Sequence, residues 1–296
     1  MKRLYKYSLT SMLLLLATGL LSGCEVGGVL DPKGVMAAQE KDLIFIALGL
    51  MLIVVIPVFI MTFLFAYKYR ASRPNEKYTP DWEHNNWLEF IWWLIPCIII
   101  AILGTITWKT THELDPYKPL VSNVEPIEVD VVSLDWKWLF IYPKENIATV
   151  NYLAIPANTP VNFKITADSP MNGFWIPQLA GQIYAMQGMQ TQLHIMATEN
   201  GDYTGRGATF TGPGFSDMHF IVHVTDDADY QSWLSQVKSS NAEQLSTQRY
   251  IELARPSEKD PVTSFNGVAD NLFDDIMMKF MMPMDNMVDH NSVTNN

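Results

Sequence analysis

The sequence predicts a membrane-anchored α+β protein, in which a two-helix transmembrane hairpin precedes an external β-domain with a helical extension. Three observations predict this fold class: two long uncharged runs, a later change to short runs rich in β-forming residues, and a segregation of charge along the chain. The chain has 296 residues and a formal net charge of −11. Residues 1–108 are nearly neutral, whereas residues 109–296 carry 23 acidic and 11 basic side chains. Such an acidic half repels phosphates, which argues against nucleic acid as a partner.

Residues 1–23 have the pattern of a signal peptide. Basic residues precede the apolar segment Leu9–Leu21, which is too short to span a bilayer. Leu21-Ser22-Gly23-Cys24 follows and resembles the lipobox of bacterial lipoproteins. That resemblance implies cleavage before Cys24, a lipidated Cys24 and an external segment over residues 24–42. The alternative is an ordinary secretory signal with an incidental cysteine.

Two uncharged runs predict the transmembrane hairpin. Residues 43–67 would span about 37 Å as a helix, which exceeds the roughly 30 Å hydrocarbon core, and Pro57 should kink this helix. Residues 90–108 are long enough for a second crossing. The loop over residues 68–89 should be cytoplasmic because it holds four basic residues, Lys68, Arg70, Arg73 and Lys77. Two buried helices of a soluble protein would need polar faces, which these runs lack.

The region from residue 109 to residue 228 is predicted to be an external antiparallel β-sandwich or barrel. Short runs rich in Val, Ile, Phe and Tyr alternate with Pro, Gly and Asn, at residues 127–134, 160–167, 190–197 and 218–224. In the last run, His219, Ile221 and His223 share one strand face. The alternate residues, from Met218 to Val224, should face the core.

Residues 229–289 are predicted to form a helical extension rich in aromatic residues and methionine. Asp226-Asp227-Ala228 can begin a helix, and residues 244–254 predict another turn or two. Residues 290–296 should be a disordered tail. Six methionines between residues 277 and 287 could bind copper(I) through soft thioethers, but packing against the domain or a neighbouring subunit is the favoured interpretation.

Three motifs carry a resemblance over nearly the whole chain. They are His84-x4-Glu89-x2-Trp92-x3-Pro96, Trp136-Lys137-Trp138-Leu139-Phe140, and Phe174-Trp175-Ile176-Pro177-Gln178-Leu179 with the following Tyr184-Ala185-Met186-x-Gly188-Met189. Together they resemble subunit II of heme-copper respiratory oxidases, and the last motif is especially similar to the quinol-oxidising branch. The resemblance implies that the β-domain is a cupredoxin-like sandwich.

The copper site of that family is the sharpest point of comparison. In the branch that oxidises cytochrome c, one early His and a C-x-E-x-C-x3-H-x2-M segment bind a dinuclear copper centre, which needs thiolate bridges. Aligned with this pattern, only the last ligand persists, and the positions are Asn172, Gly207, Thr209, Thr211, Phe215 and Met218. Cys24 and Cys97 lie elsewhere. We therefore expect no metal site and no cofactor in this chain.

The resemblance implies a non-redox subunit of a proton-pumping ubiquinol oxidase of the bo type, in the plasma membrane of a Gram-negative bacterium. Heme and copper would then belong to the partner subunit I, ubiquinol would reach subunit I through the bilayer, and cytochrome c would not be a partner. A menaquinol oxidase of the aa type is an alternative. A stand-alone copper-binding lipoprotein that uses the methionines and the His219/His223 pair is another.

Glu89 is the ionisable residue to which we assign a possible role. It lies at the cytoplasmic edge of the second crossing, where a carboxylate merits a functional hypothesis. The resemblance implies that it marks the entrance of a proton-uptake path into the catalytic subunit. A solvated carboxylate at a helix boundary is the simpler alternative. The His219/His223 pair has no third ligand nearby in sequence, so an exposed pair is favoured over a metal site.

Overall fold

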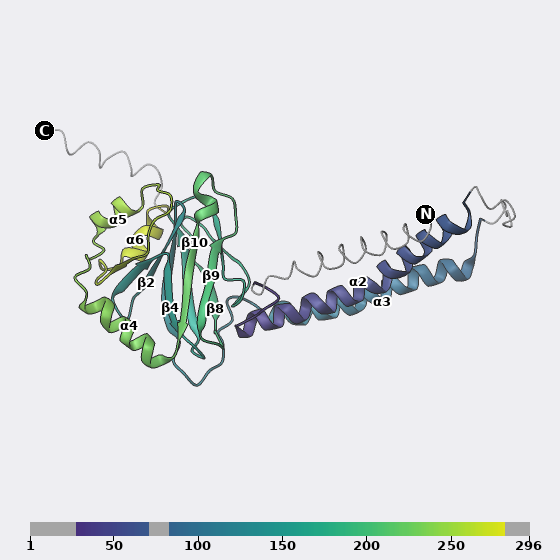
Figure 1. Cartoon of the computed structure of the whole chain (residues 1–296), viewed down its shortest axis with the longest axis horizontal. Coiled ribbons are helices and arrows are strands. Elements are labelled where there is room, and N and C mark those ends of the chain that lie inside the picture. The colour runs from purple at the N-terminus through teal and green to yellow at the C-terminus, as the bar shows by residue number, and fades with distance from the viewer. Residues whose placement is uncertain (1–27, 71–82, 282–296) are drawn as a thin grey trace, which may run out of the picture.

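The computed structural model describes residues 28–70 and 83–281. Cys24, most of the loop between the two apolar runs and the end of the methionine-rich segment lie outside these residues. Two long helices, α2 (Val35–Lys68) and α3 (Asn86–Glu113), extend from one side of a β-domain (Figure 1). Both are long and apolar enough to cross a membrane, and neither is buried within the chain over its apolar stretch. The hairpin anchor predicted from the sequence is therefore present.

Both helices are longer than their apolar runs. The first turn of α2 packs on the β-domain, where Met36 and Ala37 are buried. A side chain at Gly34 would come within 2.5 Å of the carbonyl oxygen of Leu179, so only glycine allows this close approach. At the other helix, the Asn85 side chain accepts hydrogen bonds from the amides of Trp87 and Leu88. Helix caps and domain contacts, rather than hydropathy, set these ends.

The β-domain is a sandwich of two sheets. The six-stranded sheet has the order β11-β3-β2-β1-β5-β8 and the five-stranded sheet the order β4-β10-β9-β6-β7. The strands are β1 (Ile127–Leu134), β2 (Lys137–Tyr142), β3 (Ile147–Val150), β4 (Tyr152–Pro156), β5 (Val161–Ala167), β6 (Asn172–Trp175), β7 (Ile183–Ala185), β8 (Thr191–Ile195), β9 (Gly201–Gly207), β10 (His219–Thr225) and β11 (Thr263–Phe265).

The sandwich is not wholly antiparallel, because β1 pairs with β5 and β4 with β10 in parallel. The chain changes sheets between β3 and β4 at Asn151, which has a left-handed φ of 55°. The Asn151 side chain accepts a 2.9 Å hydrogen bond from the amide of Trp138 and so fixes this corner. A strand that leaves its hairpin for the opposite sheet can meet a partner that runs in its own direction.

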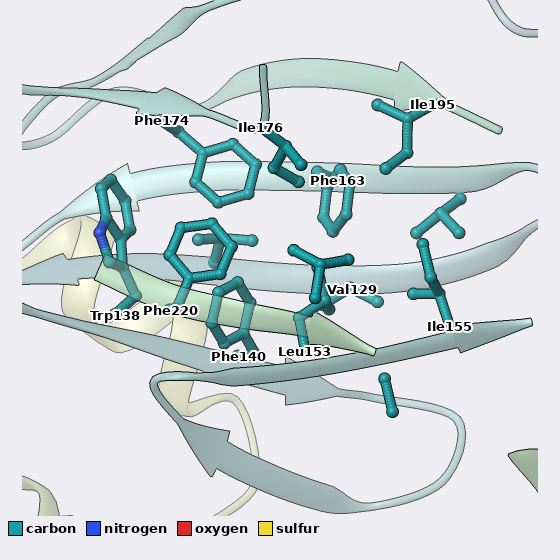
Figure 2. Close-up of a cluster of buried hydrophobic side chains, with 14 of the residues drawn as sticks. Val129, Trp138, Phe140, Leu153, Ile155, Phe163, Phe174, Ile176, Ile195 and Phe220 are labelled. Carbon is teal, nitrogen blue, oxygen red and sulfur yellow. The ribbon is translucent and has the colours of Figure 1, made fainter. Parts of the chain in front are cut away.

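Aromatic side chains fill the space between the sheets (Figure 2). Phe174 and Phe220 come from β6 and β10 and stack with ring centroids 5.3 Å apart. Phe220, Val222 and Val224 are buried, which confirms the predicted alternation along β10. Each such side chain contributes roughly 1.5–3 kcal/mol by burial. The rigid aromatic core fixes the β6, β9 and β10 backbones that carry the candidate site.

The C-terminal extension is part of the same domain. It contains α4 (Asp227–Ser239), α5 (Thr247–Leu253), β11 and α6 (Leu272–Met278), which lie on the side of the β-domain away from the helical hairpin (Figure 1). Strand β11 extends the six-stranded sheet beside β3. Tyr250 and Phe273 form a second apolar core with Val132 and Leu134 on the outer face of that sheet. The six-stranded sheet is therefore covered on both faces.

Candidate functional site

The positions that the resemblance aligns with copper ligands meet at one end of the five-stranded sheet. Antiparallel pairing of β6 with β9 places Phe174 opposite Gly207. The amide of Gly207 donates a 3.0 Å hydrogen bond to the carbonyl of Met218, just before β10. A short 3₁₀ helix, η1 (Pro213–Asp217), connects the two strands. The fold thus brings together residues that lie up to 46 positions apart in the sequence.

Asn172 is the centre of this cluster. Its side chain is buried, and its amide nitrogen Nδ2 donates to the thioether sulfur Sδ of Met218 at 2.9 Å. Its oxygen Oδ1 accepts from the amides of Gly173 at 2.8 Å and Thr209 at 3.2 Å. Both ends of the amide are therefore engaged, as a buried polar group requires. The buried Met218 sulfur serves here as a hydrogen-bond acceptor.

Gly207 has little room for a side chain. A Cβ atom there would lie 3.0 Å from both Nδ2 and Oδ1 of Asn172. A cysteine at this position would consequently need a different residue at 172. Glycine at 207 and asparagine at 172 are a matched pair.

The other two aligned positions lie on the loop before β10. The carbonyl of Thr211 accepts a 3.3 Å hydrogen bond from Trp136 Nε1. The ring of Phe215 packs edge-on against the exposed Phe210 at 5.6 Å. Phe215 also lines, with Gly207 and Met218, a concavity of about 550 Å³ on this surface. Packing to Trp136 and Phe210, rather than convergence on a common centre, holds this loop.

These residues do not fit a dinuclear copper centre. Bridging two copper ions requires thiolates, and the aligned positions provide one thioether that already accepts a hydrogen bond. Within residues 28–70 and 83–281, no group of three or more His, Cys, Asp or Glu side chains is arranged to hold a metal ion. His219 is exposed, and His223 pairs with Asp202 at 2.5 Å. We therefore derive no electron-transfer step through this domain.

Glu89 lies in the first turn of α3, the helix end that Asn85 caps. Its side chain is 39% exposed, and its Oε1 is 3.4 Å from Nδ1 of His84. A carboxylate in the first turn interacts favourably with the helix dipole. The structure thus places Glu89 at the start of a helix whose following turns are apolar, with a histidine beside it.

Two of the described methionines of the extension, Met278 and Met281, are exposed, and Met277 is partly buried. Helix α6 buries Leu272, Phe273 and Ile276, whereas Met278 and Met281 are 44% and 56% exposed. The favoured packing of this segment against its own domain therefore does not hold for Met278 and Met281. Contact with a neighbouring subunit stays a prediction.

Sequence reasoning did not single out Asp130, a buried carboxylate on β1. One signal was available, since strand alternation places Asp130 on the same face as Val132 and Leu134. An acidic residue on an otherwise apolar face indicates either an edge of the core or a site. The structure shows it beside a cavity under the extension.

The fold and the cluster define a class of protein: a membrane-anchored subunit with a cupredoxin-like domain whose aligned positions do not provide the thiolates of a dinuclear copper centre. Three family models match consecutive parts of the chain. They are the transmembrane domain of cytochrome c oxidase subunit II over residues 35–109, its periplasmic domain over residues 108–225, and the cytochrome oxidase aromatic-rich motif over residues 238–284.

Full-length relatives agree with these matches. The chain is 52% identical to the cytochrome bo(3) ubiquinol oxidase subunit 2 of Pseudomonas aeruginosa, over 88% of this chain and 78% of that protein. It is 51% identical to the ubiquinol oxidase subunit 2 of Acetobacter aceti, over 88% and 85% respectively. It is 39% identical to the quinol oxidase subunit 2 of Bacillus subtilis, over 84% and 78%. The chain belongs to the subunit II family of heme-copper respiratory oxidases.

One solved structure that matches part of this chain is the periplasmic domain of subunit II of cytochrome oxidase from Bradyrhizobium japonicum. It is 17% identical, covers 40% of this chain and 96% of that domain, and has a TM-score of 0.37. The membership in the family makes this chain a membrane protein and one component of a multi-subunit oxidase.

Proposed function

We propose that this chain is the non-redox subunit II of a proton-pumping ubiquinol oxidase, which oxidises ubiquinol and reduces oxygen to water. The observation that carries the proposal is the contact between Asn172 and Met218, where a copper-binding relative would need a histidine and a free thioether. Without a copper centre this domain offers no acceptor for cytochrome c. Quinol, being apolar, can instead reach a partner within the bilayer.

In this proposal the redox chemistry takes place in subunit I, which would hold the heme and copper. The chain's own contribution is an anchor, an external domain and a proton path. The exposed apolar surfaces of α2 and α3 would contact lipid and subunit I, because neither surface is covered within this chain. The relatives named as ubiquinol oxidases are more similar than the one named only as a quinol oxidase, which favours ubiquinol over menaquinol.

The proposed location is the plasma membrane of a Gram-negative bacterium, with the β-domain in the periplasm and a lipid on Cys24. Intact mass measurement tests the lipid. The wild-type chain should begin at Cys24 and carry acyl mass, and Cys24→Ser should lose that mass yet stay in the membrane through α2 and α3. A wild-type chain with an unmodified cysteine would contradict the lipidation.

Purification of the complex in mild detergent tests the main proposal. We expect a heme-bearing partner to co-purify, ubiquinol to support oxygen consumption and reduced cytochrome c to support none. A dinuclear copper signal from this chain, or turnover with cytochrome c alone, would refute the proposal. Turnover with menaquinol but not ubiquinol would favour the aa-type alternative. Tight copper binding by a chain that purifies without a heme partner would favour the copper-binding lipoprotein.

Glu89 is proposed as the entrance of the proton-uptake path. What supports this role is the capped start of α3 beside His84, an end that the proposed topology puts on the cytoplasmic side. Glu89→Gln should slow oxygen consumption without releasing the chain from the complex, because it removes a titratable group and keeps the shape. Glu113→Gln, at the opposite end of the same helix, is the matched control and should leave turnover unchanged. Equal rates in both variants would make Glu89 a solvated carboxylate.

A further inference from the structure

A cavity of about 330 Å³ lies between the outer face of the six-stranded sheet and the C-terminal extension. Its wall on the sheet side includes Glu128 and Asp130 of β1, Lys164 of β5 and Ile141 of β2, and residues 268–274 form the opposite wall. The extension that covers it lies away from the membrane helices (Figure 1). The cavity is therefore open to molecules in the aqueous phase rather than to lipid.

Asp130 is the most unusual group in this cavity. Asp130 is only 8% exposed, and its side-chain oxygen Oδ1 has no hydrogen-bond partner among the described residues. Buried polar atoms are nearly always hydrogen-bonded, so such an atom calls for an explanation. Burial, with the neighbouring carboxylates of Glu128 and Asp274, raises the pKa of Asp130 to about 6. At neutral pH the cavity thus keeps a poorly compensated anion.

The surrounding charges compensate Asp130 only in part, because Lys164 lowers its pKa while the nearby carboxylates raise it. Carboxylates of Glu128, Asp270 and Asp274 line the same cavity, and Lys164 is the basic side chain found among its described lining residues. The ammonium of Lys164 is 3.6 Å from Glu128 Oε2, and the register places Lys164 opposite Asp130 on the adjacent strand. One ammonium therefore faces four carboxylates. The cavity favours a cation.

The shape of the site selects the kind of cation. The described carboxylates do not form a group of three that could hold a metal ion. Guanidinium and primary ammonium groups instead carry several donors that can reach separated oxygens. Ile141 and Phe273 add apolar surface to the lining, which suits a short aliphatic stem.

We propose that this cavity binds a small soluble organic cation through a guanidinium or primary ammonium group that donates to Asp130. Asp274 on α6 contributes to the same site, so that the ligand would join the β-sheet to the extension. The source of the cationic group could also be a basic side chain of a neighbouring subunit. The experiment below separates the two.

Isothermal titration of the full-length chain in detergent micelles with agmatine, which carries both cationic groups, tests the proposal. We expect saturable one-to-one binding at pH 7.5. Asp130→Asn should weaken binding at least about tenfold, the loss of one charge-assisted hydrogen bond. Asp274→Asn, a surface change on α6, should weaken it several-fold without affecting folding. Glu125→Gln removes a carboxylate that is 81% exposed and away from the cavity lining, and should change nothing.

Three results would overturn the proposal. They are binding of agmatine that is equal in wild type and Asp130→Asn, binding that does not saturate, and full displacement of agmatine by an equal concentration of calcium chloride. Titration of the purified oxidase complex decides the source of the cation. Binding to the complex as well as to the isolated chain supports a free small molecule. Binding to the isolated chain alone would assign the site to a neighbouring subunit and would overturn the small-molecule ligand.

Discussion

The side-chain amide of Asn172 donates a hydrogen bond to the sulfur of Met218 over 2.9 Å, inside the sandwich and out of contact with water. The two residues come from β6 and from the loop before β10, so this bond joins segments that would each carry a ligand in a copper-binding relative. The side-chain oxygen of Asn172 also accepts hydrogen bonds from the backbone N–H groups of Gly173 and Thr209. The cluster has become a structural connection between strands.

The first prediction concerns the close fit of Gly207 against Asn172. Gly207→Ala should destabilise the chain by about 1–3 kcal/mol, because the new methyl group would press on the amide at 3.0 Å. In an Asn172→Ala background the added cost should be smaller, since the obstructing side chain is gone. Thermal unfolding of the wild type, the two single variants and the double variant, followed by tryptophan fluorescence, measures this coupling. Strictly additive effects would show that the two positions do not interact.

The second prediction concerns Asp168, which joins α5 and the residue after α6 to the β-sandwich. Its carboxylate accepts from the hydroxyl of Tyr250 and contacts the ammonium of Lys279, each at 2.7 Å, and the side chain is 4% exposed. Burial and this carboxylate raise the pKa of Tyr250. Asp168→Ala should cost about 1–3 kcal/mol because it leaves the Tyr250 hydroxyl unsatisfied.

Lys279→Ala is the comparison for Asp168→Ala, because the lysine is 56% exposed and its removal leaves the hydrogen bond between Tyr250 and the buried Asp168 carboxylate in place. Limited proteolysis after α5 measures release of the extension. Faster cleavage in Asp168→Ala than in Lys279→Ala is the expected order. The reverse order would place the stabilising contact on the lysine.

Hydrophobic patterns predicted the membrane helices and the strands well, because burial on one or two faces dictates the residue types along an element. Strand β10 shows this, since Phe220, Val222 and Val224 are buried as the alternation requires. Both helices begin before the apolar runs, because a close contact at Gly34 and a cap at Asn85 set their first residues. The parallel pairing of β1 with β5 depends on the sheet that each strand joins. No local sequence pattern indicates which sheet that is.

The candidate copper positions could be aligned from the sequence, but their contacts could not be foreseen. The resemblance aligned Asn172 and Met218 with ligand positions, yet nothing local indicated that the two would bond to each other. The charged contacts of the extension were also hidden. Lys137, within an aromatic strand, is buried beneath a segment more than a hundred positions later in the chain.

The third prediction concerns this buried lysine. The Lys137 ammonium is 3.1 Å from the Asp260 carboxylate, donates to the carbonyl of Arg255 at 3.1 Å and also contacts Ser257. Lys137→Met keeps the stem but removes the charge, so Asp260 and the Arg255 carbonyl lose their partner. We expect a loss of about 1–3 kcal/mol and easier proteolysis near residue 257. Lys144→Met, on the turn that follows the same strand and 51% exposed, should cost much less. Equal losses would argue against a special role for Lys137.

The last prediction concerns the pH dependence of stability through Asp130. Its pKa in the folded chain is about 6, above the ordinary value of 3.8, so the folded state binds more protons than the unfolded state between these pH values. The free energy of unfolding should therefore fall as pH rises from 4 to 7, by at most about 3 kcal/mol from this group.

The Asp130→Asn variant has no group to ionise at this position and should not show this loss of stability. We expect its melting temperature to exceed that of the wild type at pH 7.5 and to match it at pH 4. Agmatine at saturating concentration should narrow the gap at pH 7.5, because a bound cation stabilises the ionised carboxylate of the wild type alone. A variant that melts below the wild type at pH 7.5 would show that ionised Asp130 stabilises the fold.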